Sequence, residues 1–148
     1  MRSRLAGTVA VVLAIMLAAA ACGGGGTEGP AGGSPQPTEE GGTITIGGQQ
    51  ANDHGSQDVS GRDEIEVEAD DFYFEPTVLQ GSPGQALKIE VHNEGQALHN
   101  FSLTEQGIDM DVASGEDISV DVSFPDSGTL VFFCKYHRTQ GMVGGLSV

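Results

Sequence analysis

The chain has 148 residues, and its 6 Lys and Arg stand against 21 Asp and Glu, giving a formal net charge of −15 at neutral pH. A surface this acidic would repel the phosphates of a nucleic acid and the headgroups of anionic lipids, which argues against both as binding partners. It favours electrostatic steering of a basic partner, although high charge also serves solubility alone.

Residues 1–21 are predicted to be a secretory signal peptide. Two arginines begin the segment, an apolar stretch follows, and Ala19-Ala20-Ala21 stands directly before Cys22. This arrangement resembles the lipobox of bacterial lipoproteins, in which Cys22 would become the lipidated N-terminus. The alternative is an uncleaved anchor, because the apolar stretch is just long enough to cross a bilayer. Both interpretations place the remaining chain outside the cytoplasm and attach it to a membrane, at the outer face of the cytoplasmic membrane, in the periplasm or at the cell surface.

Residues 22–61 are predicted to form a disordered tether. They are rich in Gly, Pro, Ser, Thr, Gln and acidic residues, and they show no hydrophobic periodicity. Such a composition cannot bury enough apolar surface to offset the entropy of the chain. The segment Thr43–Ile46 is an island of strand-like sequence that either docks on the following domain or has no role. His54 is interpreted as a solvated linker histidine, with metal capture as the alternative.

Residues 62–148 are predicted to form one all-β domain. Apolar and polar residues alternate in short runs, and Gly, Pro and Asn separate the runs. This period-2 alternation is typical of half-buried strands, and the absence of helical periodicity favours an antiparallel sandwich. The apolar positions of the predicted strands are Ile65, Val67 and Ala69; Leu87, Ile89 and Val91; His99, Phe101 and Leu103; Ile118, Val120 and Val122; and Leu130, Phe132 and Cys134, followed by a last strand from 143 to 148.

The loop after residue 133 carries a set of potential metal ligands. Cys134, His137 and Met142 lie within nine residues, and His99 could supply a second imidazole. Thiolate, imidazole and a weak thioether are the ligands of mononuclear electron-transfer copper sites. A lone internal cysteine in an exported chain is also better explained by metal binding or reactivity than by a disulfide. Singly, these residues could be a buried thiol, two ordinary histidines and a core methionine; their combination favours copper. His92 is interpreted as a solvent-facing histidine.

This pattern resembles the cupredoxins, the plastocyanin and azurin family of blue copper proteins, from about Ile65 to the C-terminus. The resemblance implies a Greek-key β-sandwich with one type 1 copper. His99, Cys134 and His137 would be its equatorial ligands and Met142 its axial ligand. It also implies that Asn100 hydrogen-bonds across to the cysteine loop, through Thr139 or the backbone near Lys135. Further matching segments are Phe74-Glu75-Pro76, Gly84, Val91-His92-Asn93 and Gly144-Gly145.

The function implied is that of a monomeric, membrane-tethered protein that carries single electrons and is not itself an enzyme. Its partner would be a redox protein such as a c-type cytochrome or a terminal oxidase or reductase. One alternative is copper storage or delivery, which the small number of methionines disfavours. The other is a copper-containing subunit of a redox enzyme. The related red copper proteins replace the axial methionine with a carboxylate, so Met142 argues against that alternative.

Overall fold

The structure, a computed structural model, describes residues 41–148. The predicted signal peptide, Cys22 and the first part of the predicted tether lie outside these residues. Within residues 41–148, β-strands are joined by loops and by two short 3-10 helices, η1 (Thr104–Gln106) and η2 (Arg138–Gln140). No helix in this part of the chain has the length and apolar character that crossing a bilayer requires.

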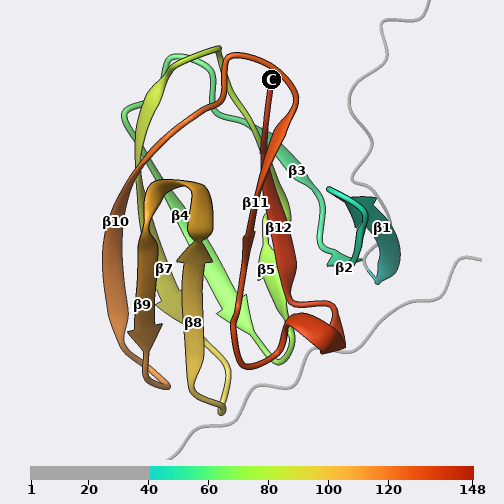
Figure 1. Cartoon of the computed structure of the whole chain (residues 1–148). Helices are drawn as coiled ribbons and strands as arrows, with labels where there is room; N and C mark the ends of the chain where they lie inside the picture. Colours follow the sequence, from blue (N-terminus) through green and yellow to red (C-terminus); the bar gives the residue numbers. More distant parts are fainter. Residues whose placement is uncertain (1–40) are drawn as a thin grey trace, which may run out of the picture. The chain divides into compact units, whose positions relative to one another are not determined.

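Two sheets form a β-sandwich, so the predicted all-β fold is confirmed (Figure 1). The first sheet has the order β10 (Asp117–Ser123), β7 (Ala86–Asn93), β4 (Glu64–Asp70) and β5 (Tyr73–Glu75). The second has the order β3 (Ser56–Asp58), β6 (Val78–Gln80), β12 (Val143–Ser147), β11 (Thr129–Phe133), β8 (His99–Leu103) and β9 (Ile108–Val112).

The expected antiparallel pairing does not hold for three strand pairs. β4 pairs with β7 in parallel, and β6 pairs in parallel with both β12 and β3. The chain leaves the first sheet after β5, forms β6 in the second sheet, and returns to the first as β7. A strand that returns after such a crossover can lie parallel to its neighbour, whereas a tight hairpin always gives an antiparallel pair.

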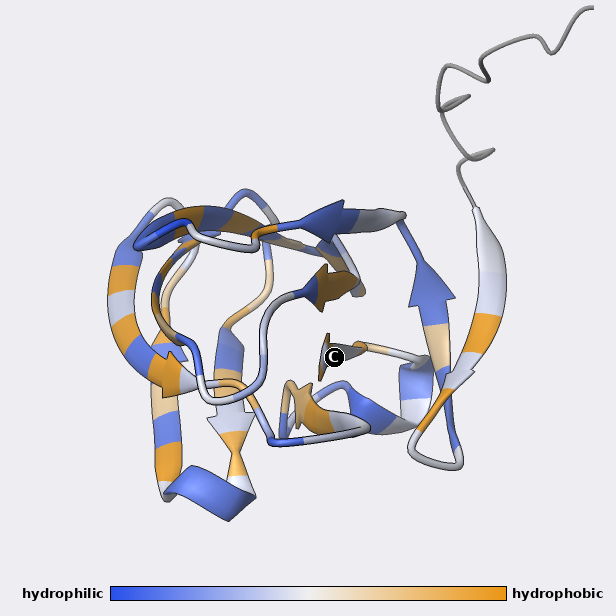
Figure 2. Ribbon diagram, turned by 90° about the horizontal axis from the view of Figure 1, so that it is seen from above, coloured by the Kyte–Doolittle hydropathy of each residue, from blue (hydrophilic) through white to orange (hydrophobic). Residues whose placement is uncertain are grey.

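Alternation along the strands decides which side chains face the core. In β7, Leu87, Ile89 and Val91 are buried, while Lys88 and Glu90 point outward. Figure 2 shows the same alternation of hydrophobic and hydrophilic residues along the strands of the sandwich. Because successive side chains of a strand point to opposite faces, the first sheet has an apolar inner face and a polar outer face. The outer face of the second sheet carries a further apolar cluster around Val143.

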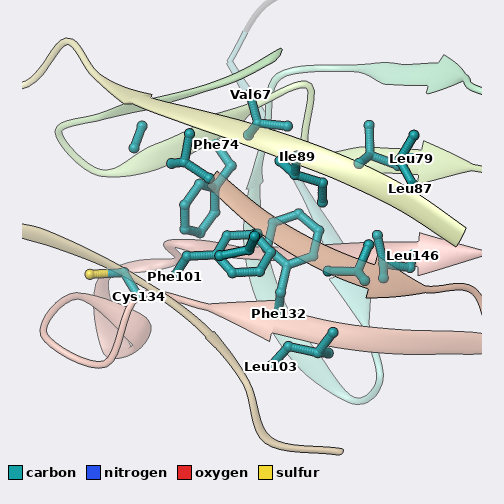
Figure 3. Close-up of a cluster of buried hydrophobic side chains, with 14 of the residues drawn as sticks. Val67, Phe74, Leu79, Leu87, Ile89, Phe101, Leu103, Phe132, Cys134 and Leu146 are labelled. Atoms are coloured by element: carbon teal, nitrogen blue, oxygen red, sulfur yellow. The ribbon is translucent and has the colours of Figure 1, made fainter. Parts of the chain in front are cut away.

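An aromatic cluster fills the core at the end of the sandwich that carries Cys134. The rings of Phe101 and Phe132 are stacked with centroids 4.9 Å apart, and Phe74 meets Phe132 edge to face at 5.2 Å. Figure 3 shows Cys134 at the margin of this cluster, with its sulfur beyond the rings. The packed core therefore gives the chain after β11 a rigid starting point.

A hairpin of β1 (Gly42–Ile46) and β2 (Gln49–Asp53) precedes the sandwich strands. Ile46 and Ala51 are buried and form a small cluster with Val143 of β12. The prediction that residues 22–61 are disordered is therefore wrong for residues 42–58, which contain the strands β1, β2 and β3. The composition of this segment is polar, but a full antiparallel ladder joins β1 to β2, and two buried apolar side chains pack the hairpin against the second sheet.

His54 is also not the solvated linker histidine that was expected. Its ring stacks on Tyr73, with centroids 3.4 Å apart and the planes at 6°. Its backbone N–H donates to the hydroxyl of Thr77 at 2.7 Å. The segment that follows β2 is thus fixed against β5 and the start of β6.

Candidate metal centre

Three side chains predicted to bind metal come together at one end of the sandwich. His99 is the first residue of β8, Cys134 follows the last residue of β11, and His137 precedes η2. One potential ligand atom from each lies within 4.8 Å of the others. The Nδ1 atoms of the two histidines are 3.2 Å apart, and the Cys134 sulfur is 3.5 Å from Nδ1 of His137. His99 and Cys134 are fully buried, whereas His137 is partly exposed.

The loop between Cys134 and Met142 is closed by its own backbone. The N–H of Cys134 donates to the carbonyl of Met142 at 3.0 Å, and the N–H of His137 donates back to Cys134 at 3.2 Å. Gly141 has φ of +93°, which favours glycine and lets the chain turn into β12. Met142 is fully buried in the same apolar cluster as Cys134. The loop thus returns Met142 to Cys134, while His137 stays at the surface.

Burial controls the electrostatics of these groups. Burial raises the pKa of the Cys134 thiol, although N–H groups near it, including that of Asn100, act in the opposite direction. Burial also lowers the pKa of His99, while the hydrogen bond to Asp71 opposes the decrease and the neighbouring His137 adds to it. A metal cation bound here would stabilise the thiolate form of Cys134, and the two imidazole nitrogens would coordinate the same cation. Soft sulfur with two imidazoles fits copper.

Asn100 joins the strand that carries His99 to the loop that carries Cys134. Its side-chain oxygen accepts a hydrogen bond from the backbone N–H of Lys135 at 3.3 Å. This is the contact expected near Lys135, and Thr139 is not the partner. Its side-chain nitrogen donates to Asp109 at 2.8 Å and to Asp111 at 2.9 Å. The fully buried amide therefore ties the loop to both β8 and β9.

Lys135 also contributes to this connection. Its ammonium group lies 2.7 Å from a carboxylate oxygen of Asp109 and 2.8 Å from one of Asp111. These partners raise the pKa of Lys135, chiefly through the two side-chain hydrogen bonds. The lysine beside the predicted ligands is thus paired with carboxylates of β9.

Asp71 contacts the candidate site and was missed by the sequence analysis. One of its carboxylate oxygens lies 2.9 Å from Nε2 of His99. Partial burial acts to raise the pKa of Asp71, but hydrogen bonds from the backbone of Gln96 and Ala97 and from His99 outweigh it and lower the pKa. The adjoining Phe72 lies against His137, with ring centroids 4.3 Å apart. The turn between β4 and β5 therefore covers both histidines.

Asn52 of the β1–β2 hairpin is a second residue that the sequence analysis missed. Its backbone N–H donates to the carbonyl of Gly141 at 2.9 Å. Its side-chain nitrogen donates to the carbonyls of Gln140 at 2.9 Å and Phe72 at 2.8 Å. The hairpin is thereby bonded to the loop between His137 and Met142. Nothing in the sequence of this polar segment indicated such a contact.

The other predicted positions lie elsewhere. His92 of β7 hydrogen-bonds to Asp117 of β10 on the outer face of the first sheet, so the expectation that it faces solvent is confirmed. Cys22 lies outside the described residues.

Comparison with known proteins agrees with this geometry. The family model for the cupredoxin-like domain matches residues 43–144. Halocyanin of Natronomonas pharaonis is 28% identical over 97 residues, which cover 62% of this chain and 60% of that protein. The match therefore spans less than two thirds of the relative's length.

Two solved structures share the fold at low sequence identity. The metal-binding domain of the Cu(I)-exporting P-type ATPase CopA of Streptococcus pneumoniae D39 has a TM-score of 0.52 at 17% identity, covering 62% of this chain and 95% of that one. A haem-copper terminal oxidase dimer has a TM-score of 0.51 at 16% identity, covering 78% and 74%. The family model matches more than half of the chain and includes His99, Cys134, His137 and Met142. The chain belongs to the cupredoxin family, and its cofactor is a type 1 copper.

Proposed function

We propose that the protein carries single electrons at a copper held by His99, Cys134 and His137, with Met142 as a weak axial ligand. The observation that supports this proposal most directly is the convergence of one sulfur and two imidazole nitrogens within 4.8 Å at the end of the sandwich. A copper bound there would supply reversible one-electron exchange between Cu(I) and Cu(II).

Rigid ligands favour this function over others. The closed loop from Cys134 to Met142, the amide of Asn100 and the side chain of Asn52 all restrain the donor atoms through hydrogen bonds. Ligands that are held in place independently of the metal move little when its charge changes, and a small rearrangement speeds electron transfer. The partly exposed His137 offers a short route between the site and a partner at the surface.

Copper delivery and enzymatic redox chemistry are the alternatives. A delivery site must release its metal readily, which fits poorly with three fully buried ligands and a hydrogen-bonded loop. Within residues 41–148, the ligand atoms of His99, Cys134 and His137 are the one cluster suited to a metal. This supports a carrier with one copper.

Voltammetry of the copper-loaded full chain, combined with azide titration, separates the three functions. The electron carrier is expected to show a reversible one-electron wave, and azide should leave its visible spectrum unchanged. The variant His137→Gly is the matched control, because removing the partly exposed ligand should open a position that azide can occupy. Azide binding by the wild-type protein, or copper lost to a mild chelator within minutes, would contradict the proposal.

The tether and the partner form the second part of the proposal. We infer that Cys22 is lipidated and holds the domain at the outer face of the cytoplasmic membrane, where a monomer exchanges electrons with a c-type cytochrome or a terminal oxidase or reductase. The support is the order of basic, apolar and small residues before Cys22. The intact mass of the membrane-extracted protein tests it. A diacylglyceryl addition that is absent from Cys22→Ser is expected, and an unmodified full-length chain would contradict lipidation.

A further inference from the structure

The most informative contact that the proposed function does not use is the one between Asp71 and His99. Asp71 lies between β4 and β5, 28 residues before His99, and its Oδ1 atom is 2.9 Å from Nε2 of the imidazole. The side chain of His99 is fully shielded from solvent, while that of Asp71 is 31% exposed. The carboxylate therefore reaches inward from the surface to the far side of a buried ring.

This contact determines which nitrogen of His99 carries the proton. An ionised carboxylate can only accept hydrogen bonds, so Nε2 must be the protonated nitrogen of a neutral imidazole. The lone pair of Nδ1 then points toward His137 and Cys134, where the ligand atoms converge. In metal sites, a carboxylate on the second ring nitrogen fixes the tautomer and orientation and makes the ligand more basic.

The loop before His99 is built around this carboxylate. The backbone N–H groups of Gln96 and Ala97 donate to Asp71 at 3.2 and 3.3 Å. Gly95 leaves the necessary space: a Cβ at that position would lie 2.5 Å from Oδ1 of Asp71 and 2.7 Å from Nε2 of His99. Any larger residue would force the carboxylate or the imidazole to move. Three hydrogen bonds therefore hold the carboxylate of Asp71, and Gly95 leaves the space for its contact with His99.

We propose, on the basis of the copper function above, that Asp71 is a positioning residue. It orients the imidazole of His99 for the metal and lowers the reduction potential of the copper. The physical reason for the second effect is electrostatic. Cu(II) carries one more positive charge than Cu(I), so a negative charge one imidazole ring away stabilises the oxidised state more. A purely structural hydrogen bond would hold the ring but would not shift the potential in this way.

Two substitutions separate orientation from charge. Asp71→Asn keeps an oxygen that can accept from Nε2 but removes the charge, so the blue band should persist while the reduction potential rises. Asp71→Ala removes both the hydrogen-bond acceptor and the charge. The reduction potential should rise, and the affinity for Cu(II) should fall roughly 10–100-fold. The exposed carboxylate of Asp126, in the connection between β10 and β11, provides the charge-matched control. Asp126→Asn should match the wild type in both measurements.

Nitrogen-15 NMR of the metal-free full-length proteins tests the orientation without copper. In the wild type, His99 should be the Nε2–H tautomer with a slowly exchanging ring proton, and in Asp71→Ala this preference should be lost. An unchanged tautomer and affinity in Asp71→Ala would overturn the positioning role. A potential in Asp71→Asn equal to that of Asp126→Asn would overturn the charge effect. A wild-type protein that forms no thiolate–copper band contradicts the proposed function instead, so the two failures are distinguishable.

Discussion

His92 and His99 lie on consecutive strands, and their surroundings give them opposite properties. His99 is buried at the candidate copper site, and burial lowers its pKa. His92 is on the outer face of the first sheet, and the hydrogen bond to Asp117 raises its pKa above the ordinary 6.5. The sequence shows two similar histidines in strands. Register alone places one in the core and the other in solvent, because a shift by one residue exchanges the two faces of a strand.

The raised pKa of His92 predicts a pH-dependent contribution to stability. A group with a folded pKa above its unfolded value binds protons more tightly when folded. The contribution is therefore fully present below about pH 6.5 and disappears as the pH rises through the folded pKa. Thermal unfolding of the wild type and Asp117→Asn should differ most near pH 5.5 and little near pH 8. A difference of equal size at both values would contradict this account; Asp126→Asn controls for the loss of a surface charge.

At the scale of residues, the sequence is most informative where chemistry is unusual. The loop of Cys134, His137 and Met142 could be recognised as a candidate metal site because sulfur and imidazole groups occur together in it. Asp71 could not be predicted, because nothing distinguishes it from the adjacent Asp70 in the sequence. Only the fold gives the two aspartates different contacts. Asp70 accepts a hydrogen bond from the hydroxyl of Tyr73, and Asp71 contacts the imidazole of His99.

The β1–β2 hairpin is the element that the sequence analysis misplaced, and it supports the copper loop directly. Its composition resembles a linker because Gln49, Gln50, Asn52 and Asp53 are polar. In the structure, the side chain of Asn52 bridges two carbonyl groups, one in the loop and one beside the β4–β5 turn. A Cβ at Gly141 would lie 2.6 Å from this side chain, so the loop and the hairpin are in close contact. Copper studies therefore require a chain that includes the hairpin.

Asn52→Ala is expected to loosen the loop between His137 and Met142. Loss of the two side-chain hydrogen bonds should lower the free energy of unfolding by about 1–2 kcal/mol. Hydrogen exchange should accelerate at the backbone N–H groups of residues 140–142. Gln50→Ala, on the exposed side of the same strand, is the matched control. If both variants show the same protection of these N–H groups as the wild type, the side chain of Asn52 does not restrain the loop.

At the scale of the whole molecule, the sandwich follows from the alternation of apolar residues, which indicates the inner face of each strand. The same alternation does not say which strands are neighbours, so the parallel pairs β4–β7 and β6–β12 could not be predicted from it. The core of Phe74, Phe101 and Phe132 then fixes the strands on which Cys134 and the histidines depend.

The type 1 copper site can be tested by the visible absorption spectrum of the full chain after addition of Cu(II), with Cys134→Ser as the control. An intense blue thiolate-to-copper band is expected in the wild type, because the sulfur of Cys134 lies beside the ligand atoms of His99 and His137. The band should be lost in Cys134→Ser. A weak band, or one that the substitution leaves unchanged, would mean that copper binds elsewhere and would contradict the electron-carrier function.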